Sequence, residues 1–231
     1  MKPHIFVSLL CLGLGSVVAF AAAPTTGATA ATAAATTPAA GAKPADLSKN
    51  IEVAAVRFNN VNPPGGGAAG AWHEVEIEIK IKPEATKDAS RFVNRVRATL
   101  TLGTEVVGSA KRIDFYRATA EATTLEVGSS FIRFYLPAEI VRRDSLRGES
   151  KYYAVELAVA GQVLPMGKAN HTANPAVMPS VQTFLVKALS EAPANDGVLL
   201  PQYLTPFAND ATRPAPAYVR PEAAPTATPQ I

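Results

Sequence analysis

The stretch from Trp72 to Lys82 (WHEVEIEIKIK) alternates apolar and charged residues from its third position onward. Successive side chains of an extended strand point to opposite faces, so this alternation gives one apolar face and one charged face. Wound into a helix, the same residues would scatter the isoleucines around the cylinder and leave no apolar stripe. The stretch is therefore predicted to be a β-strand. Its apolar face comprises Val75, Ile77, Ile79 and Ile81, and its charged face comprises Glu74, Glu76, Glu78, Lys80 and Lys82.

A strand with a single apolar face needs a second layer to cover it, which favours an antiparallel sandwich or barrel. Similar alternation recurs at 92–102, 112–118, 131–136 and 152–160, with turn residues between these segments. Together with weaker segments, they predict a mainly β, immunoglobulin-like antiparallel sandwich of about seven strands. The residues expected to face the core are Val96, Ala98, Leu100, Leu102, Ile113, Phe115, Ile132, Phe134, Leu136, Tyr153, Val155, Leu157 and Val159.

Three segments outside this regular alternation have patterns of their own. In the first strand, the apolar residues Ile51, Val53 and Ala55 are followed by a shifted register at Val56 and Phe58, which predicts a bulge or kink. Residues 138–144 are predicted to form a short helical crossover. The apolar segment 197–207 (GVLLPQYLTPF) is interrupted by two prolines, so we expect it to lie along the fold as an extended strap. An amphipathic C-terminal helix of about 12 residues is predicted from the helical spacing of Val181, Phe184, Leu185 and Ala188.

The N-terminal segment has the parts of a secretory signal: Lys2, then an apolar run, then small residues up to Ala23. We predict that residues 1–23 are a signal peptide and that the processed chain is secreted or periplasmic. The alternative is an uncleaved segment, which would anchor the chain in a membrane. Cys11 is the only cysteine and lies within this segment, so the processed chain is expected to lack disulfides and thiolate chemistry.

Composition divides the remainder into three parts. Residues 24–48 are mostly Ala, Thr and Pro, and residues 209–231 are rich in Pro and Ala. Neither segment has enough large apolar side chains to offset the entropy of ordering, so both are predicted to be disordered. The folded domain is predicted to span residues 49–208, and its core must be stable without covalent cross-links.

The chain contains no arrangement typical of an enzyme. His73 and His171 are isolated from each other, and the sequence has neither an H-E-x-x-H nor a G-x-S-x-G motif. The aspartates do not follow a calcium-loop pattern. We therefore predict a non-enzymatic protein with no cofactor and no metal. Loss of Lys2 with a signal would leave 21 basic against 19 acidic residues, a balance that does not favour nucleic-acid binding.

The better candidate for a functional site is a surface. In the immunoglobulin order, the strands at 92–102, 112–118 and 152–160 share one sheet. Their outward residues would bring arginines and tyrosines together on one face, a composition favoured at protein contacts. The alternative is an ordinary solvated face with local ion pairs among these residues, Asp114 and Glu156. The candidate binding residues are Arg95, Arg97, Arg112, Tyr116 and Tyr152.

Two runs of sequence resemble a known family. The segment 131–161 (FIRFYLP, AEIVRRD and YYAVELAVAG) is similar to the E strand, crossover, F strand and hairpin of immunoglobulin-like domains. With 197–207, it resembles the exported immunoglobulin-like accessory proteins encoded beside bacterial type IV pilus components. This resemblance covers about residues 50–207 and transfers no site residue. It implies an accessory role in a pilus or secretion assembly.

Three functional hypotheses remain open from the sequence. The first is an exported, non-enzymatic domain that binds another protein. The second is a carbohydrate-binding module or adhesin, in which exposed Trp72, Tyr116 and Tyr152 stack on sugars. The third is a secreted hydrolase on a sandwich scaffold, which lacks a recognisable catalytic constellation.

Overall fold

The computed structural model describes residues 50–66, 70–83, 90–106, 108, 112–165, 167, 171–173 and 180–220. The predicted signal peptide at 1–23 and linker at 24–48 lie outside the described residues, as does the end of the predicted tail at 221–231.

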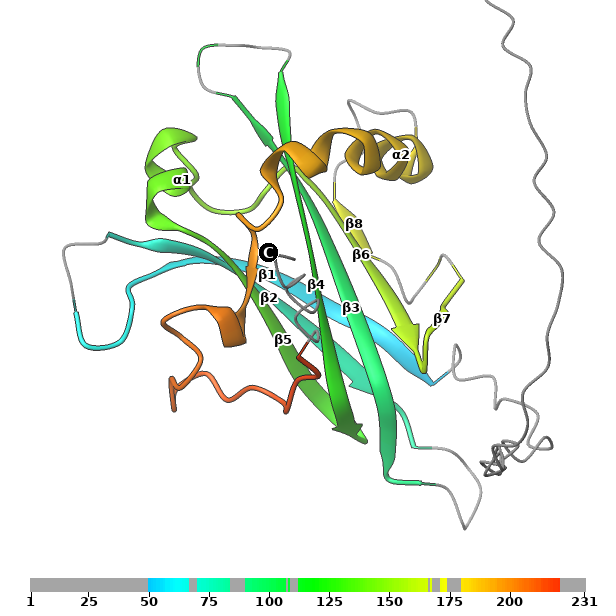
Figure 1. Ribbon diagram of the computed structural model, residues 1–231. Coiled ribbons are helices and arrows are strands. Elements are labelled where there is room, and N and C mark those ends of the chain that lie inside the picture. The colour runs from blue at the N-terminus through cyan, green and yellow to red at the C-terminus, as the bar shows by residue number, and fades with distance from the viewer. Residues whose placement is uncertain are drawn as a thin grey trace, which may run out of the picture. The chain divides into compact units, whose positions relative to one another are not determined.

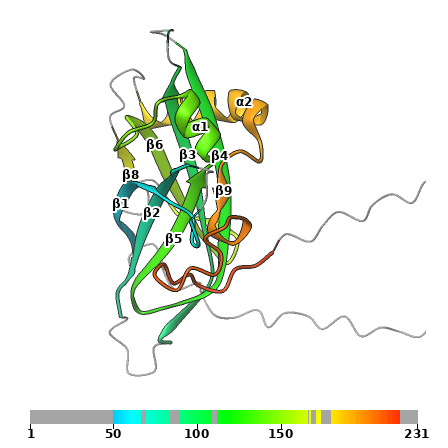
Figure 2. The same cartoon turned by 90° about the vertical axis from the view of Figure 1, so that its left-hand side faces the viewer.

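Two antiparallel sheets form the two layers of a sandwich (Figures 1 and 2). Sheet A has the order β1-β2-β5-β9, and sheet B has the order β4-β3-β6-β7, with β8 also paired to β6. These orders correspond to the A-B-E and C′-C-F-G sheets of immunoglobulin-like domains, so the predicted fold class is confirmed. The strands are β1 (Ile51–Val61), β2 (Trp72–Ile81), β3 (Phe92–Glu105), β4 (Ile113–Glu126), β5 (Gly128–Leu136), β6 (Tyr152–Val159), β7 (Gln162–Val163), β8 (His171–Ala173) and β9 (Leu200–Pro201).

The core lies between the sheets and is built from the faces that the alternation predicts. In β2, the four residues of the predicted apolar face are at most 2 % exposed. They face the apolar sides of β3 and β6 in sheet B, and they form one continuous core cluster with these residues and with the inward residues of the neighbouring β5. The register of β1 against β2 shifts between Val53 and Ala55, which confirms the predicted bulge. Arg133 of β5 pairs with Glu76 of β2 on the outer face of sheet A, at 2.7 Å.

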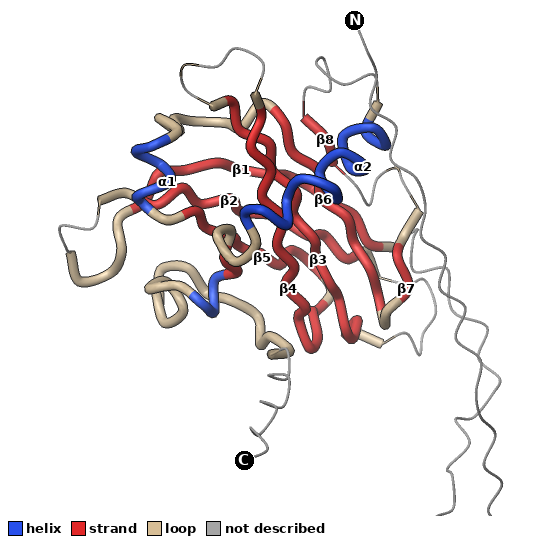
Figure 3. Tube along the Cα trace, turned by 45° about the horizontal axis from the view of Figure 1, so that its top comes forward, coloured by secondary structure: helices blue, strands red, loops and turns tan. Residues whose placement is uncertain are grey.

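Two α-helices and two short 3₁₀ turns accompany the sheets. The crossover α1 (Ala138–Arg143) follows β5, and α2 (Val181–Glu191) crosses the outer face of sheet B (Figures 1 and 3). Ser180 caps α2, because its Oγ accepts a hydrogen bond from the Thr183 amide at 3.1 Å. The buried side chains of α2 are Phe184, Leu185 and Ala188, as the helical spacing predicts. The 3₁₀ turns are η3 (Ala192–Asn195) and η4 (Gln202–Leu204).

The first half of β4 is oriented opposite to the prediction. Phe115 is paired with Gly103 and lies on the outer face of sheet B, where its ring is 5.7 Å from that of Phe184 in α2. Tyr116 is paired with Leu102 and faces the core between the sheets. Because α2 supplies a second apolar layer, both faces of the strand are dry here. Apolar alternation alone cannot distinguish such faces.

Gly103 allows α2 to pack closely against sheet B. A Cβ at this position would lie 3.0 Å from Ile113 Cγ2 and 3.2 Å from Tyr152 Cβ. We expect Gly103→Ala to lower the free energy of unfolding by about 1–3 kcal/mol, because these neighbours must shift. Thr124→Ala, at an exposed position of β4 away from α2, is the control. Equal urea midpoints for the two variants would contradict this close packing.

The chain after β9 crosses the outer face of sheet A and reaches the edge of sheet B (Figure 2). Phe207 stacks on Tyr135 of β5, and Arg213 pairs with Glu74 of β2 at 2.9 Å. Tyr218 then forms an antiparallel bridge with Ala122 of β4. Residues 209–220 therefore differ from the predicted disordered tail. Backbone pairing and the ion pair with buried Glu74 hold this segment in place. Amino-acid composition predicts neither interaction.

Candidate functional site

The three strands chosen from the sequence do lie side by side, as β4-β3-β6 of sheet B. Arg97 is half-buried on the outer face, and within the described residues its side chain has no ion pair or hydrogen bond. Arg95 is exposed and pairs with Glu121. Arg112 is exposed at the start of β4 and lies 3.2 Å from Asp114.

The two candidate tyrosines are not accessible, and this part of the prediction is corrected. Tyr116 is 0 % exposed and donates a hydrogen bond to Asp144 Oδ2 at 3.0 Å. Burial, followed by the nearby charge of Asp144, raises the pKa of Tyr116 to about 12. Tyr152 is on the outer face, but it is 4 % exposed because it belongs to the cluster beneath α2. Trp72 is half-buried against Phe207, so these three aromatics form no exposed platform for sugar stacking.

The part of sheet B that α2 leaves uncovered contains two adjoining hollows. One hollow has a volume of about 260 Å³ and lies over β4, β3 and β6, with Arg97 and Val163 among its lining residues. The other, of about 430 Å³, extends to Leu189 of α2. They share Arg117 and Thr119. We call this surface the open face, and its residues are Arg97, Thr99, Arg117, Thr119, Glu156, Val163 and Leu189.

The open face combines positive charge with exposed apolar side chains. Arg117 forms an ion pair with Glu156 at 3.2 Å, whereas Arg97 has no such partner in the described part of the chain. Val163 is 60 % exposed and Leu189 is 57 % exposed. Sequence reasoning identified Arg97 but missed both apolar residues. Val163 lies in a two-residue strand, and Leu189 is an exposed residue of α2, so only the fold shows that they line hollows on the same face as Arg97.

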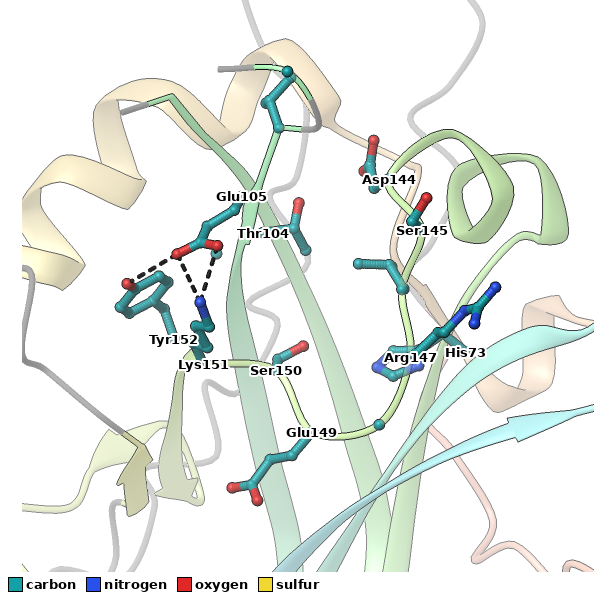
Figure 4. Close-up of a pocket in the computed structure, with 15 residues that line it drawn as sticks. His73, Thr104, Glu105, Asp144, Ser145, Arg147, Glu149, Ser150, Lys151 and Tyr152 are labelled. Carbon is teal, nitrogen blue, oxygen red and sulfur yellow. Dashed lines mark hydrogen bonds and ion pairs between the residues drawn. The ribbon is translucent and has the colours of Figure 1, made fainter. Parts of the chain in front are cut away.

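A second candidate is a pocket of about 570 Å³ at one end of the sandwich. Its walls are the end of β3 at 103–106 and the connection from α1 to β6 at 144–151, and His73 of β2 also lines it. Figure 4 shows Glu105, Lys151 and Tyr152 on one side and Asp144, Ser145, Arg147 and His73 on the other. We call it the end pocket.

His73 is the most buried polar residue of the end pocket, with 1 % of its surface exposed. Its Nδ1 lies 2.8 Å from Asn60 Oδ1, and its ring stacks on Phe58 at 5.8 Å between centroids. Nε2 is buried and has no hydrogen-bond partner among the described residues. Leaving such a group unpaired costs about 1–3 kcal/mol. The sequence contained one indication that His73 is buried: it lies two residues before Val75 in the same strand and therefore shares its inward face.

The buried imidazole makes stability depend on pH. Burial lowers the pKa of His73 to about 4, against about 6.5 in an unfolded chain. The unfolded chain therefore binds more protons between these values, so stability falls as the pH drops from 6.5 to 4. We expect a loss of about 2–3 kcal/mol from this group, since one pKa unit corresponds to about 1.4 kcal/mol.

Urea unfolding of the wild type and His73→Phe, from pH 7.5 down to pH 4, would measure this dependence. The difference in free energy of unfolding between the two proteins should change across this range and be flat above pH 7. Parallel curves for the two proteins would show that His73 is not buried in its neutral form.

Across the described part of the chain, no three His, Cys, Asp or Glu side chains are grouped so that they could hold a metal ion. Two carboxylates of the end pocket are paired: Glu105 with Lys151 at 3.0 Å, and Asp144 with Arg143 of α1 at 2.6 Å. No helix among the described residues is long and apolar enough to span a membrane.

Comparison with known proteins supports the fold. No family model matches the chain, and no curated protein matches it. A crystal structure from Akkermansia muciniphila is similar, with a TM-score of 0.55 and 15 % sequence identity. The match covers 74 % of this chain and 94 % of that one. At this identity the likeness shows a shared β-sandwich fold and nothing about function.

Proposed function

We propose that this chain is a non-enzymatic, exported domain that binds another protein through the open face, as an accessory component of a type IV pilus or secretion assembly. The pilus context rests on the resemblance of residues 131–161 and 197–207 to accessory proteins of those systems. Export rests on the signal pattern at 1–23.

One observation carries the binding surface: Arg97 has no charged partner among the described residues and lines a hollow with exposed Val163, beside the hollow that Leu189 lines. Arginine is enriched at protein contacts, because its planar group combines a large contact area with several hydrogen-bond donors. Isolated exposed apolar residues are common. Here, however, two of them border adjoining hollows that share the polar residues Arg117 and Thr119 of β4. A partner segment with a carboxylate beside apolar side chains would match this face.

Site-specific cross-linking tests the proposal. A photoreactive residue in place of exposed Thr119 should capture one protein in the cells that produce this chain. The same residue in place of Lys80, exposed on the opposite sheet, should not capture it. The captured protein is then identified by mass spectrometry and its affinity for the purified chain is measured.

Charge reversal provides the matched comparison. Arg97→Glu should weaken binding of the captured partner by about 2 kcal/mol or more, as expected at the centre of a contact. Arg91→Glu makes the same change at a side chain that is 79 % exposed and outside the open face, so binding should stay within about 0.5 kcal/mol. Equal affinities for the two folded variants would overturn the assignment of the surface.

A further inference from the structure

The end pocket is separate from the open face and has a built-in hydrogen-bond acceptor. A backbone carbonyl can only accept, so the Asn60 atom that lies 3.0 Å from Leu146 O must be the amide nitrogen. The amide oxygen of Asn60 is therefore the atom that faces His73 Nδ1. Nδ1 carries the proton and donates, which leaves Nε2 with a free lone pair.

Nothing in the described part of the chain uses that lone pair. Nε2 is buried and has no partner there, while the ring is held by Asn60 on one side and Phe58 on its face. The low pKa of His73 keeps the imidazole neutral at ordinary pH, so Nε2 acts as an acceptor. A preorganised acceptor in a pocket calls for a ligand with a hydrogen-bond donor, such as a hydroxyl group.

The charges around the pocket favour a neutral ligand. Glu105 and Lys151 neutralise each other, and Asp144 is held by Arg143 and by the Tyr116 hydroxyl. The remaining charged linings, Arg147 and Glu149, have opposite signs and are exposed. Their charges sum to zero, so they can donate and accept hydrogen bonds without attracting a ligand of either charge.

The volume and the polar lining narrow the ligand class further. About 570 Å³ is within the usual range of small-molecule pockets, which is roughly 300–1,000 Å³. Ser145 and Ser150 add hydroxyl groups that can both donate and accept. We propose that the end pocket binds a neutral polyhydroxylated molecule, a mono- or disaccharide, with one ligand hydroxyl donating to His73 Nε2.

Nuclear magnetic resonance of the ¹⁵N-labelled wild-type protein tests this directly. The probes are glucose, galactose, mannose, N-acetylglucosamine and their disaccharides, at up to roughly 10 mM, which detects a Kd near 1 mM. At least one of them should shift the His73 Nε2 signal and the amides of 103–106 and 144–151. Butylamine serves as the cationic comparison. Binding of butylamine alone, or no shift at His73 with any sugar, would overturn the proposal.

A single substitution then measures the contribution of the acceptor. His73→Phe keeps an aromatic ring against Phe58 but removes Nε2, so the affinity for the sugar should fall about tenfold, the value of one good hydrogen bond. Lys80→Gln, at an exposed position of β2 outside the end pocket, should bind the sugar within about threefold of the wild type. Unchanged affinity in folded His73→Phe would refute the role of Nε2. Because His73 is not part of the open face, cross-linking at Thr119 should be the same in both variants.

Discussion

Replacing Phe207 with alanine should lower the free energy of unfolding by about 3–5 kcal/mol, a large share of the 5–15 kcal/mol typical of a domain. Phe207 is 0 % exposed and stacks on Tyr135, with ring centroids 4.4 Å apart. It also meets Trp72 edge-on and lies under the guanidinium of Arg213. Truncation would open a cavity between the strap and sheet A, which the rigid strands cannot close.

Leu204→Ala is the matched control for Phe207→Ala. Leu204 lies three residues earlier in the same strap and is 59 % exposed, so its truncation should cost no more than about 0.5 kcal/mol. Urea unfolding monitored by Trp72 fluorescence measures both variants. A Phe207→Ala midpoint equal to that of Leu204→Ala would mean that the strap is not packed on sheet A in solution.

The second large effect is expected at Arg213, whose Nε lies 2.9 Å from Glu74 Oε2. Glu74 is 3 % exposed, so Arg213→Met would leave a buried carboxylate without a cation. Breaking a buried pair in this way typically costs 3–5 kcal/mol. Arg213 is itself partly exposed and the Tyr135 hydroxyl still donates to Glu74, so we expect about 3 kcal/mol.

Two further variants separate the ion pair from a general loss of contacts. Adding Glu74→Gln to Arg213→Met should restore part of the stability, because it removes the unpaired charge. Arg142→Met, on the exposed side of α1, should cost no more than about 0.5 kcal/mol. If the double variant were less stable than Arg213→Met, the buried charge would not be the cause of the loss.

The Arg213 prediction concerns a segment whose order the sequence did not indicate. Residues 209–220 are poor in large apolar side chains, so composition favours disorder. Their order depends on partners elsewhere in the chain: Glu74 in β2, and the edge of β4, where the Thr123 amide donates to Ala217 O at 2.8 Å. Sequence pattern reports the residue itself and its near neighbours, so it contains no signal for such distant partners.

The candidate surface was also predicted only in part from local sequence pattern. Alternation correctly placed Arg97 outward in a strand between β4 and β6. It failed for Tyr116, which faces the core and donates a hydrogen bond to Asp144. It placed Tyr152 correctly on the outer face but could not show that α2 covers this end of sheet B. A helix that begins more than 20 residues after β6 decides which half of the sheet is open, and no local pattern in the strands reveals its position.

By itself, the sequence determined the sandwich, the inward faces of β2, β3, β5 and β6, the bulge in β1 and the amphipathic α2. Each follows from the two-residue or 3.6-residue period of apolar side chains, which is a local property of the chain. Only the tertiary structure decided which surfaces stay open, that the C-terminal segment is fastened to both sheets, and that His73 faces a pocket with an unpaired nitrogen. These features arise from contacts between residues far apart in sequence, and such contacts exist only once the two sheets have packed together.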